Sequence, residues 1–209
     1  MSTSPISRIP RIGYGWDSHE FQSGVPLKIG GINLPHHSGL AGHSDGDVLL
    51  HALTDALLGA IAAGDIGTFF PPTDPRWKGA DSAVFLQHAL KRVTRAGYSI
   101  ANVDSTLILA APKISPHARK IQVHVADLLG VPASAVSVKA KTPEGMGTDN
   151  AAIAHVTVLL VSQGQDLGPR VSAAEAVPQS EIDRLVKEVL RDVPEPKRQV
   201  KIKPVKAKK

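Results

Sequence analysis

The nonapeptide Arg11-Ile-Gly-Tyr-Gly-Trp-Asp-Ser-His19 combines an expected β-strand with the first candidate metal ligands. Its first six residues are typical of a strand, and the two glycines among them allow a substrate or another backbone to approach closely. Residues i and i+2 of an extended segment lie on the same face. We therefore expect Asp17 and His19 to point to one side of the chain and to contact the same ion.

A third candidate ligand, His51, lies in the first turns of an expected helix that begins near Asp47. Two imidazoles and one carboxylate suit Zn²⁺, and three protein ligands leave a fourth position open for water or substrate. Asp55, one helical turn after His51, is a candidate partner for the imidazole, or else a solvated helix residue. Each of these residues alone has a simpler role on the surface or in the core. Their combination predicts a zinc site that takes part in chemistry.

Beyond this stretch, the pattern of apolar residues, glycines and prolines predicts an α+β domain. Strands are expected at residues 11–16, 102–110, 135–140 and 153–161, helices at residues 47–63, 81–95 and 116–129, and loops at residues 35–42 and 64–75. Gly30-Gly31 predicts a tight hairpin turn, because both residues tolerate a positive φ. We expect a mixed four-stranded sheet with helices on one face, plus this hairpin. The uncovered face of such a sheet predicts an oligomer.

The length of 209 residues fits one catalytic domain followed by an extension. We expect the domain at residues 1–162, and a linker, a short helix and a disordered Lys-rich tail at residues 163–209. Residues 197–209 contain six lysines, one arginine and no acidic residue, a charge that exceeds the net +5 of the whole chain. The domain itself is therefore not basic, and nucleic acid is not expected as its partner.

The composition also excludes several classes of protein. The chain has no cysteine, which excludes disulfides and leaves His, Asp, Glu or backbone oxygen as metal ligands. No apolar run reaches the roughly 20 residues of a membrane-spanning helix, and the first residues lack the features of a signal peptide. We expect a cytoplasmic protein that does not bind membranes.

Three further segments contain residues suited to phosphate or to hydroxyl groups. His43 and Ser44 precede a helix start, where free backbone N–H groups favour an anion, although Ser44 could equally serve as a helix cap. Residues 64–75 form an acidic, proline-rich loop whose carboxylates can accept hydrogen bonds. In a third, glycine-rich loop, Thr142 can bond a phosphate oxygen and Glu144 can bind a cation such as Mg²⁺. Both loops are also compatible with ordinary surface turns.

Several motifs occur in a fixed order along the chain. They are Arg11 to His19, Gly42-His-Ser-Asp-Gly-Asp47, His51-Ala-Leu-Thr-Asp-Ala-Leu-Leu-Gly59, Gly64-Asp-Ile-Gly67, Phe70-Pro-Pro-Thr-Asp-Pro75, Gly79-Ala-Asp-Ser82 and Ala111-Pro-Lys113. Together they resemble the 2-C-methyl-D-erythritol 2,4-cyclodiphosphate synthases of the non-mevalonate isoprenoid pathway. The resemblance extends from Arg8 to Val161, over nearly all of the expected domain.

The resemblance implies a metal-dependent phosphorus–oxygen lyase. Its substrate would be 4-diphosphocytidyl-2-C-methyl-D-erythritol 2-phosphate, and its products 2-C-methyl-D-erythritol 2,4-cyclodiphosphate and CMP. The resemblance also implies that Asp17, His19 and His51 bind Zn²⁺ and that Glu144 binds a second divalent cation, Mg²⁺ or Mn²⁺. The 2-phosphate of the substrate is already an anionic nucleophile, so no strong general base is required.

The substrate contacts are implied by the same motifs. His43 and Thr142 would be catalytic residues that stabilise the transition state. Contacts with the substrate are implied for Asp17, His19, His43, Ser44, Asp65, Ile66, Gly67, Phe70, Pro71, Pro72, Thr73, Asp74, Ala110, Ala111, Pro112, Lys113, Ile114, Ser115, Lys141, Thr142, Pro143 and Glu144. The family is a homotrimer whose sheets pack as a β-prism, with active sites between subunits. That arrangement agrees with the uncovered sheet face.

Three positions depart from the family pattern. Ser18 replaces an apolar residue and should point away from the metal, and Pro72 replaces an aspartate that is common there. Gly147-Thr-Asp-Asn150 replaces the longer segment Phe-Thr-Gly-Arg-Gly-Glu. This change removes an arginine that usually contacts phosphate, and Lys141 is a candidate to compensate for it.

Two other functions stay open. The first is a zinc phosphohydrolase that uses a bound hydroxide, which water incorporation into the product would reveal. The second is a nucleotide-binding or RNA-associated protein that acts through the Lys-rich tail, whose function would be lost on deletion of residues 194–209.

Overall fold

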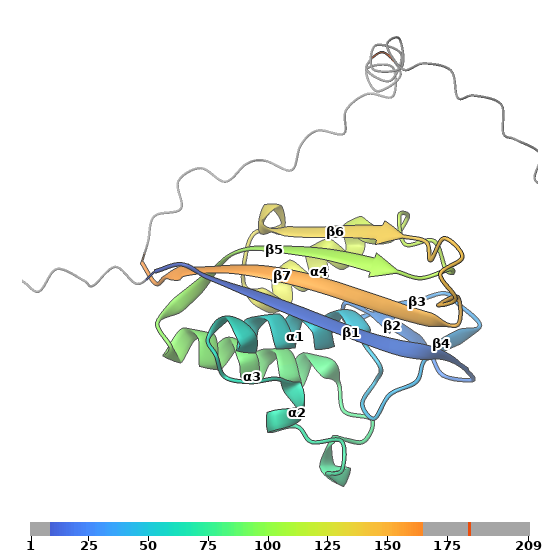
Figure 1. Cartoon of the computed structure of the whole chain (residues 1–209), viewed down its shortest axis with the longest axis horizontal. Helices are drawn as coiled ribbons and strands as arrows, with labels where there is room; N and C mark the ends of the chain where they lie inside the picture. Colours follow the sequence, from blue (N-terminus) through green and yellow to red (C-terminus); the bar gives the residue numbers. More distant parts are fainter. Residues whose placement is uncertain (1–8, 165–183, 185–209) are drawn as a thin grey trace, which may run out of the picture. The chain divides into compact units, whose positions relative to one another are not determined.

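The structure, a computed structural model, describes residues 9–164 and Arg184 (Figure 1). The predicted linker, short helix and Lys-rich tail therefore lie almost entirely outside the described residues, and the division of the chain at residue 162 stays a prediction. Within the described ranges, no helix is both long enough and apolar enough to cross a membrane.

A five-stranded sheet of mixed direction forms the centre of the described chain (Figure 1). Its order is β4-β1-β7-β5-β6, and only β5 and β6 are parallel. The strands are β1 (Arg11–Ser23), β4 (Ser38–Leu40), β5 (Tyr98–Ile108), β6 (Val136–Lys141) and β7 (Ala151–Ser162), and the separate hairpin consists of β2 (Leu27–Ile29) and β3 (Ile32–Leu34). The predicted α+β class, with a mixed sheet and a hairpin, is confirmed.

The sheet has one short strand more than the four predicted. β4 lies within residues 35–42, where we expected only a loop, and it pairs with the end of β1. Its three residues are too few to show the alternation by which a strand is detected. β1 extends beyond its predicted end to Ser23, because β7 and β4 pair with successive parts of it. Asp17 and His19 therefore lie within the strand itself.

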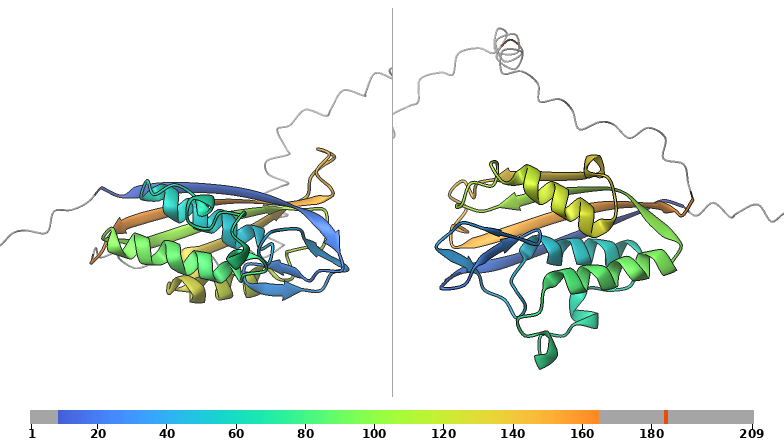
Figure 2. Two further views of the ribbon diagram at one scale, coloured as in Figure 1. Left: turned by 90° about the horizontal axis from the view of Figure 1, so that it is seen from below. Right: turned by 180° about the vertical axis from the view of Figure 1, so that it is seen from behind.

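Three helices cover one face of the sheet, as predicted (Figure 2). They are α1 (Val48–Ala60), α3 (Ser82–Arg95) and α4 (Ala118–Leu129). The expected loop at residues 64–75 instead contains two short helical turns, α2 (Ile66–Phe69) and η1 (Pro75–Trp77). Asp65 and Asp74 begin these turns, because their carboxylates accept backbone N–H groups. Turns this short have no apolar periodicity to reveal them.

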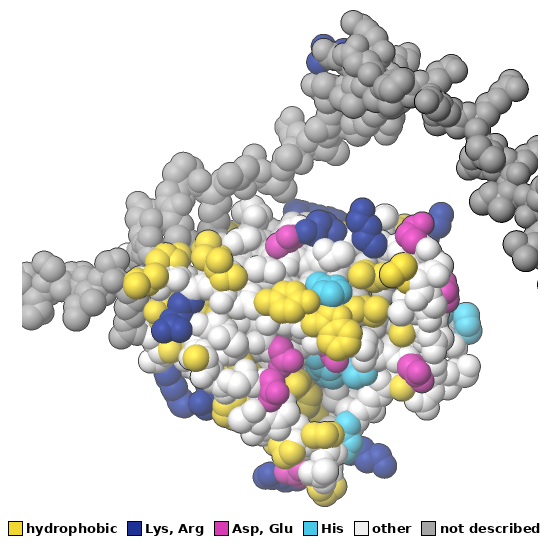
Figure 3. All heavy atoms as spheres, viewed as in Figure 1, with side chains coloured by type: hydrophobic (Ala, Val, Ile, Leu, Met, Phe, Trp, Pro, Cys, Tyr) yellow, Lys and Arg dark blue, Asp and Glu magenta, His cyan; other side chains and the backbone are white. Residues whose placement is uncertain are grey.

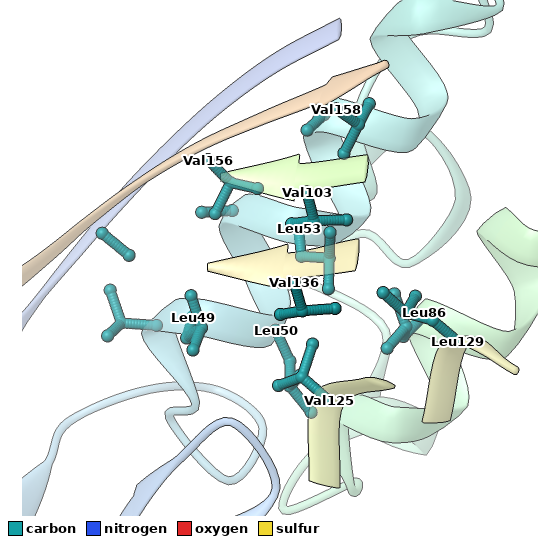
Figure 4. Close-up of a cluster of buried hydrophobic side chains, with 14 of the residues drawn as sticks. Leu49, Leu50, Leu53, Leu86, Val103, Val125, Leu129, Val136, Val156 and Val158 are labelled. Atoms are coloured by element: carbon teal, nitrogen blue, oxygen red, sulfur yellow. The ribbon is translucent and has the colours of Figure 1, made fainter. Parts of the chain in front are cut away.

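The core lies between the sheet and the helices (Figure 4). Its central side chains are aliphatic and nearly fully buried, and they include Leu49, Leu50, Leu53, Leu86, Val103, Val125, Leu129, Val136, Val156 and Val158. Burial of each such side chain contributes about 1.5–3 kcal/mol relative to leaving it in water. The three leucines of α1 in this set hold that helix, and with it His51, against the sheet.

α1 also meets β1 with no side chain between them. A Cβ atom added to Gly15 would lie 1.9 Å from the carbonyl oxygen of Ala52, and one added to Gly13 would lie 1.9 Å from that of Ala56. Only glycine fits at either position. The predicted close approach is confirmed, and its partner is the backbone of α1 rather than a substrate.

Asp47, the residue that caps α1, joins this helix to the hairpin. Its buried carboxylate accepts hydrogen bonds from the backbone N–H groups of Gly30 at 2.9 Å, Gly31 at 2.6 Å and Leu50 at 3.0 Å. The two glycines have φ values of 62° and 80°, as a tight hairpin turn requires. One side chain therefore fixes both the start of α1 and the position of the hairpin.

We expect Asp47→Ala to lower the free energy of unfolding by about 2–3 kcal/mol, because it leaves buried N–H groups without a partner. Urea denaturation followed by circular dichroism measures this change. Asp127→Ala, at an exposed position of α4, is the matched control and should change the free energy by less than about 0.5 kcal/mol. Equal midpoints for the two variants would show that the cap does not stabilise the fold.

The opposite face of the sheet carries exposed side chains. Ile12, Tyr14 and Trp16 project from β1 on this face with 72%, 59% and 49% of their surface exposed. The Tyr14 hydroxyl lies 2.8 Å from Nδ1 of His155 on β7. Figure 3 shows hydrophobic and histidine side chains gathered on this side of the molecule. Contiguous exposed apolar groups of this kind mark interaction surfaces.

Candidate active site

The three predicted metal ligands converge on one point. Oδ2 of Asp17 lies 2.9 Å from Nε2 of His19 and 3.0 Å from Nδ1 of His51, and the two ring nitrogens are 3.0 Å apart. β1 provides the first two residues from one face, and the first turn of α1 provides the third. Within the described part of the chain, no other cluster of three or more His, Cys, Asp or Glu side chains has the spacing of a metal site.

The chemistry and spacing of this triangle fit Zn²⁺. A tetrahedral zinc ion bonds nitrogen and oxygen ligands at about 2.0–2.1 Å, which places the ligand atoms about 3.3 Å apart. The observed separations of 2.9–3.0 Å need only a small expansion. Burial alone would raise the pKa of the Asp17 carboxyl, but hydrogen bonds from His19 and His51 hold that pKa well below its usual range. The carboxylate is therefore ionised and ready to bind a cation.

The second ring nitrogen of His51 contacts two serine hydroxyls. Nε2 lies 2.9 Å from Oγ of Ser44 and 2.8 Å from Oγ of Ser82. Asp55, the candidate partner from the sequence, instead accepts a hydrogen bond of 2.7 Å from the backbone N–H of Ile66 and so ties the start of α2 to α1. The sequence marked Ser82 only as the last residue of a motif, with no role assigned to it.

A cavity of about 310 Å³ opens beside the triangle. Its lining consists of His19, His43, Ser44, His51, Ile66, Gly67, Phe70, Pro72 and Phe85. All but Phe85 are among the predicted site residues. The sequence shows Phe85 only as one apolar residue of the amphipathic helix α3, so nothing in the pattern distinguishes it from a core residue.

The predicted aspartates of the neighbouring loop do not line this cavity, nor do Pro71 and Thr73. Asp65 accepts hydrogen bonds from the backbone and the hydroxyl of Thr68 at 2.8 and 2.7 Å, which lower the pKa of its carboxyl. Asp74 pairs with the guanidinium of Arg76 at 2.6 Å. The backbone oxygen of Asp74 lies 3.2 Å from Nε2 of His43. The two carboxylates hold the loop through these contacts.

A second cavity, of about 380 Å³, lies where β5 and β6 end. It is lined by Leu109, Ala110, Pro112, Lys113, Ile114, Ser115, Ala140, Lys141, Thr142 and Glu144. Most of these residues are the predicted cytidine and phosphate contacts, whereas the predicted residues Ala111 and Pro143 are absent from the lining. The hydroxyl of Thr142 donates a hydrogen bond to the carboxylate of Glu144.

The two cavities share no residue within one chain. In the register of the sheet, Asp17 pairs with Ala154, Ala154 with Leu107, and Leu107 with Ala140. Asp17 and Ala140 are therefore three strand spacings apart, about 14 Å. The structure brings the predicted site residues together in two groups rather than one.

Comparison with known proteins shows the family of this chain. A model described as the YgbB family matches residues 10–161. The 2-C-methyl-D-erythritol 2,4-cyclodiphosphate synthase of Koribacter versatilis (strain Ellin345) is 63% identical over 150 residues, which cover 72% of this chain and 97% of that protein. The chloroplastic synthase of Oryza sativa subsp. japonica is 51% identical over 154 residues, which cover 72% and 69% of the respective chains.

A solved structure named "Structure of 2C-Methyl-D-erythritol-2,4-cyclodiphosphate Synthase (bound form CDP)" has the same fold. It aligns with a TM-score of 0.68 and 42% identity, and the alignment covers 72% of this chain and 99% of that one. The family match spans the five-stranded sheet, its helices and both cavities. The chain belongs to the YgbB family, the family of the 2-C-methyl-D-erythritol 2,4-cyclodiphosphate synthases.

Proposed function

We propose that this chain converts 4-diphosphocytidyl-2-C-methyl-D-erythritol 2-phosphate to 2-C-methyl-D-erythritol 2,4-cyclodiphosphate and CMP. The observation that carries the proposal is the Asp17, His19 and His51 triangle beside a cavity whose lining includes residues for which the family resemblance implies phosphate and sugar contacts. Relatives that this chain covers almost completely carry the name of this synthase.

The reaction is an intramolecular displacement at phosphorus, so positioning and charge neutralisation account for most of the catalysis. The imidazole of His43 and the hydroxyl of Ser44 line the cavity next to the triangle and donate to phosphate oxygens there. Ile66, Gly67 and Phe70 enclose the methylerythritol part and exclude water. None of these side chains needs to remove a proton, because the nucleophile is already an anion.

Two cations belong to this proposal. Asp17, His19 and His51 would hold Zn²⁺, and Glu144 would hold Mg²⁺ or Mn²⁺ beside Thr142, the second catalytic residue. When bound, such ions act as Lewis acids that neutralise phosphate charge and orient the diphosphate. Lys113 and Lys141 line the same cavity as Glu144 and supply positive charge there. In this proposal the two lysines replace the phosphate-contacting arginine of the family segment that is changed at residues 147–150 of this chain.

The active protein is a homotrimer in this proposal. The backbones of Asp17 and of Ala140, which lines the second cavity, lie about 14 Å apart in one chain, too far for one compact diphosphate to contact both closely. A neighbouring subunit that docks against the uncovered sheet face would bring its own second cavity beside the first cavity of its partner. The exposed side chains of β1 on that face support this arrangement.

The test is an assay of CMP release from the diphosphocytidyl substrate with Zn²⁺ and Mg²⁺. We expect cyclic diphosphate and CMP in equal amounts, with no ¹⁸O incorporated from labelled water. Incorporation of ¹⁸O would establish a phosphohydrolase instead. A variant that lacks residues 194–209 should retain full activity, whereas its inactivity would favour function through the tail. A folded, zinc-loaded protein that releases no CMP would refute the proposal.

A further inference from the structure

Two serine hydroxyls contact the imidazole of His51 at Nε2, the ring nitrogen that faces away from Asp17 and His19. Its Nε2 atom lies 2.8 Å from Oγ of Ser82 and 2.9 Å from Oγ of Ser44. Ser82 has no exposed surface, and only 9% of the surface of His51 is exposed. The contact between His51 and Ser82 is therefore shielded from water, where a hydrogen bond constrains geometry most strongly.

The hydrogen-bond donors in this contact can be assigned. Ser82 has one hydroxyl proton, and its Oγ makes a very short contact with Oδ1 of Asp45. An ionised carboxylate only accepts hydrogen bonds, so the hydroxyl proton of Ser82 points to Asp45. Oγ of Ser82 must then accept from Nε2–H of His51. Nδ1, on the other side of the ring, faces Asp17 and His19 and is the atom that a bound ion would contact.

Asp45 is itself held in place as an ionised acceptor. Nζ of Lys28 lies 2.7 Å from its Oδ2 and 3.0 Å from Oδ2 of Asp81. The backbone N–H of Ser82 also donates to Oδ2 of Asp45, at 3.2 Å. Burial would raise the pKa of the Asp45 carboxyl, but the hydrogen bonds from Lys28 and Ser82 outweigh it and lower that pKa.

We propose that Ser82 is a positioning residue for the metal site, which holds the proton of His51 on Nε2 and thereby presents Nδ1 to the metal. Asp45 and Lys28 orient the Ser82 hydroxyl. A hydrogen-bonded partner on the second nitrogen of a metal-bound imidazole fixes its tautomer and orientation, and its loss weakens metal binding about 10- to 100-fold. The inference rests on the proposed zinc site and extends it to residues that do not touch the ion.

The first experiment measures the Kd for zinc of the full-length protein by competition with a chromophoric chelator. We expect Ser82→Ala to raise this Kd about 10- to 100-fold. The helix start survives the change, because Asp81 still caps α3. Ser105→Ala is the matched control: it also removes a buried hydroxyl, one that donates to the backbone oxygen of Ser137 at 2.7 Å, but on β5, which β7 separates from β1. Its Kd should equal that of the wild type.

The second experiment reads the Nε2–H proton of His51 directly in the zinc-loaded protein, from its NMR signal and its rate of exchange with water. We expect a slowly exchanging, hydrogen-bonded proton in the wild type and faster exchange in Ser82→Ala. An equal exchange rate in the two proteins would overturn the inference. So would a zinc Kd that is the same in Ser82→Ala and in the wild type, and this result would leave the proposed function intact. A wild-type protein that binds no zinc would overturn both.

Discussion

His19→Ala should reduce the rate of CMP release by roughly three orders of magnitude at saturating Zn²⁺ and Mg²⁺. The change removes one corner of a triangle whose three atoms are within 3.0 Å of one another. Two remaining ligands hold zinc weakly and leave the diphosphate without a fixed orientation. His19 lies at the edge of the first cavity rather than in the core, so the fold should persist. Steady-state assays of the variant and of the wild type give the ratio of their rates of CMP release.

His37→Ala is the matched control, because His37 is an exposed histidine outside both cavities. Its activity and zinc content should match those of the wild type. If His19→Ala kept more than about a tenth of the wild-type rate, the triangle would not be the catalytic metal site.

Gly15→Val should lower the free energy of unfolding by about 3 kcal/mol or more, and activity should disappear with it. Even the first carbon of the new side chain would overlap the carbonyl oxygen of Ala52, at 1.9 Å, and backbone cannot rotate away as a side chain can. α1 must therefore move off β1, which separates His51 from Asp17. Urea denaturation and zinc titration measure the two consequences separately.

Gly59→Ala, in helix α1, is the control for this prediction. A Cβ atom there would lie 3.9 Å from the backbone oxygen of Tyr14, an ordinary contact. Alanine favours the helical state over glycine by about 1 kcal/mol, so this variant should be more stable than the wild type. Opposite signs for the two glycine variants are the expected outcome. Equal stability of Gly15→Val and the wild type would contradict the close contact.

The sequence predicts this fold well wherever a feature is local and repetitive. The helices α1, α3 and α4, the Gly30-Gly31 turn and the places of the long strands along the chain all follow from patterns of a few residues. The metal triangle follows because Asp17 and His19 share one face of a strand and His51 begins a helix. The short elements β4, α2 and η1 could not be found this way, since each is stabilised by a pairing or a cap rather than by periodicity.

The contacts behind the site were also beyond the sequence. Asp55 and Ser82 are both polar residues near His51. Asp55 binds the backbone of Ile66 at the start of α2, whereas Ser82 contacts the imidazole of His51. Which of the two residues contacts His51 depends on how α3 packs against α1, and this packing involves residues far apart in the chain. Phe85 enters the first cavity for the same reason. Where several residues have suitable side chains, tertiary packing rather than local sequence pattern determines which of them lies at the site.

The contact between Gly15 and Ala52 also affects how the site binds a metal ion. At Gly15, no side chain stands between the strand that carries Asp17 and the helix that carries His51. The distance between these two elements is thus set by backbone atoms in direct contact rather than by side chains that can change rotamer. The three ligand residues are therefore held on a preorganised support, and little backbone entropy is lost when an ion binds.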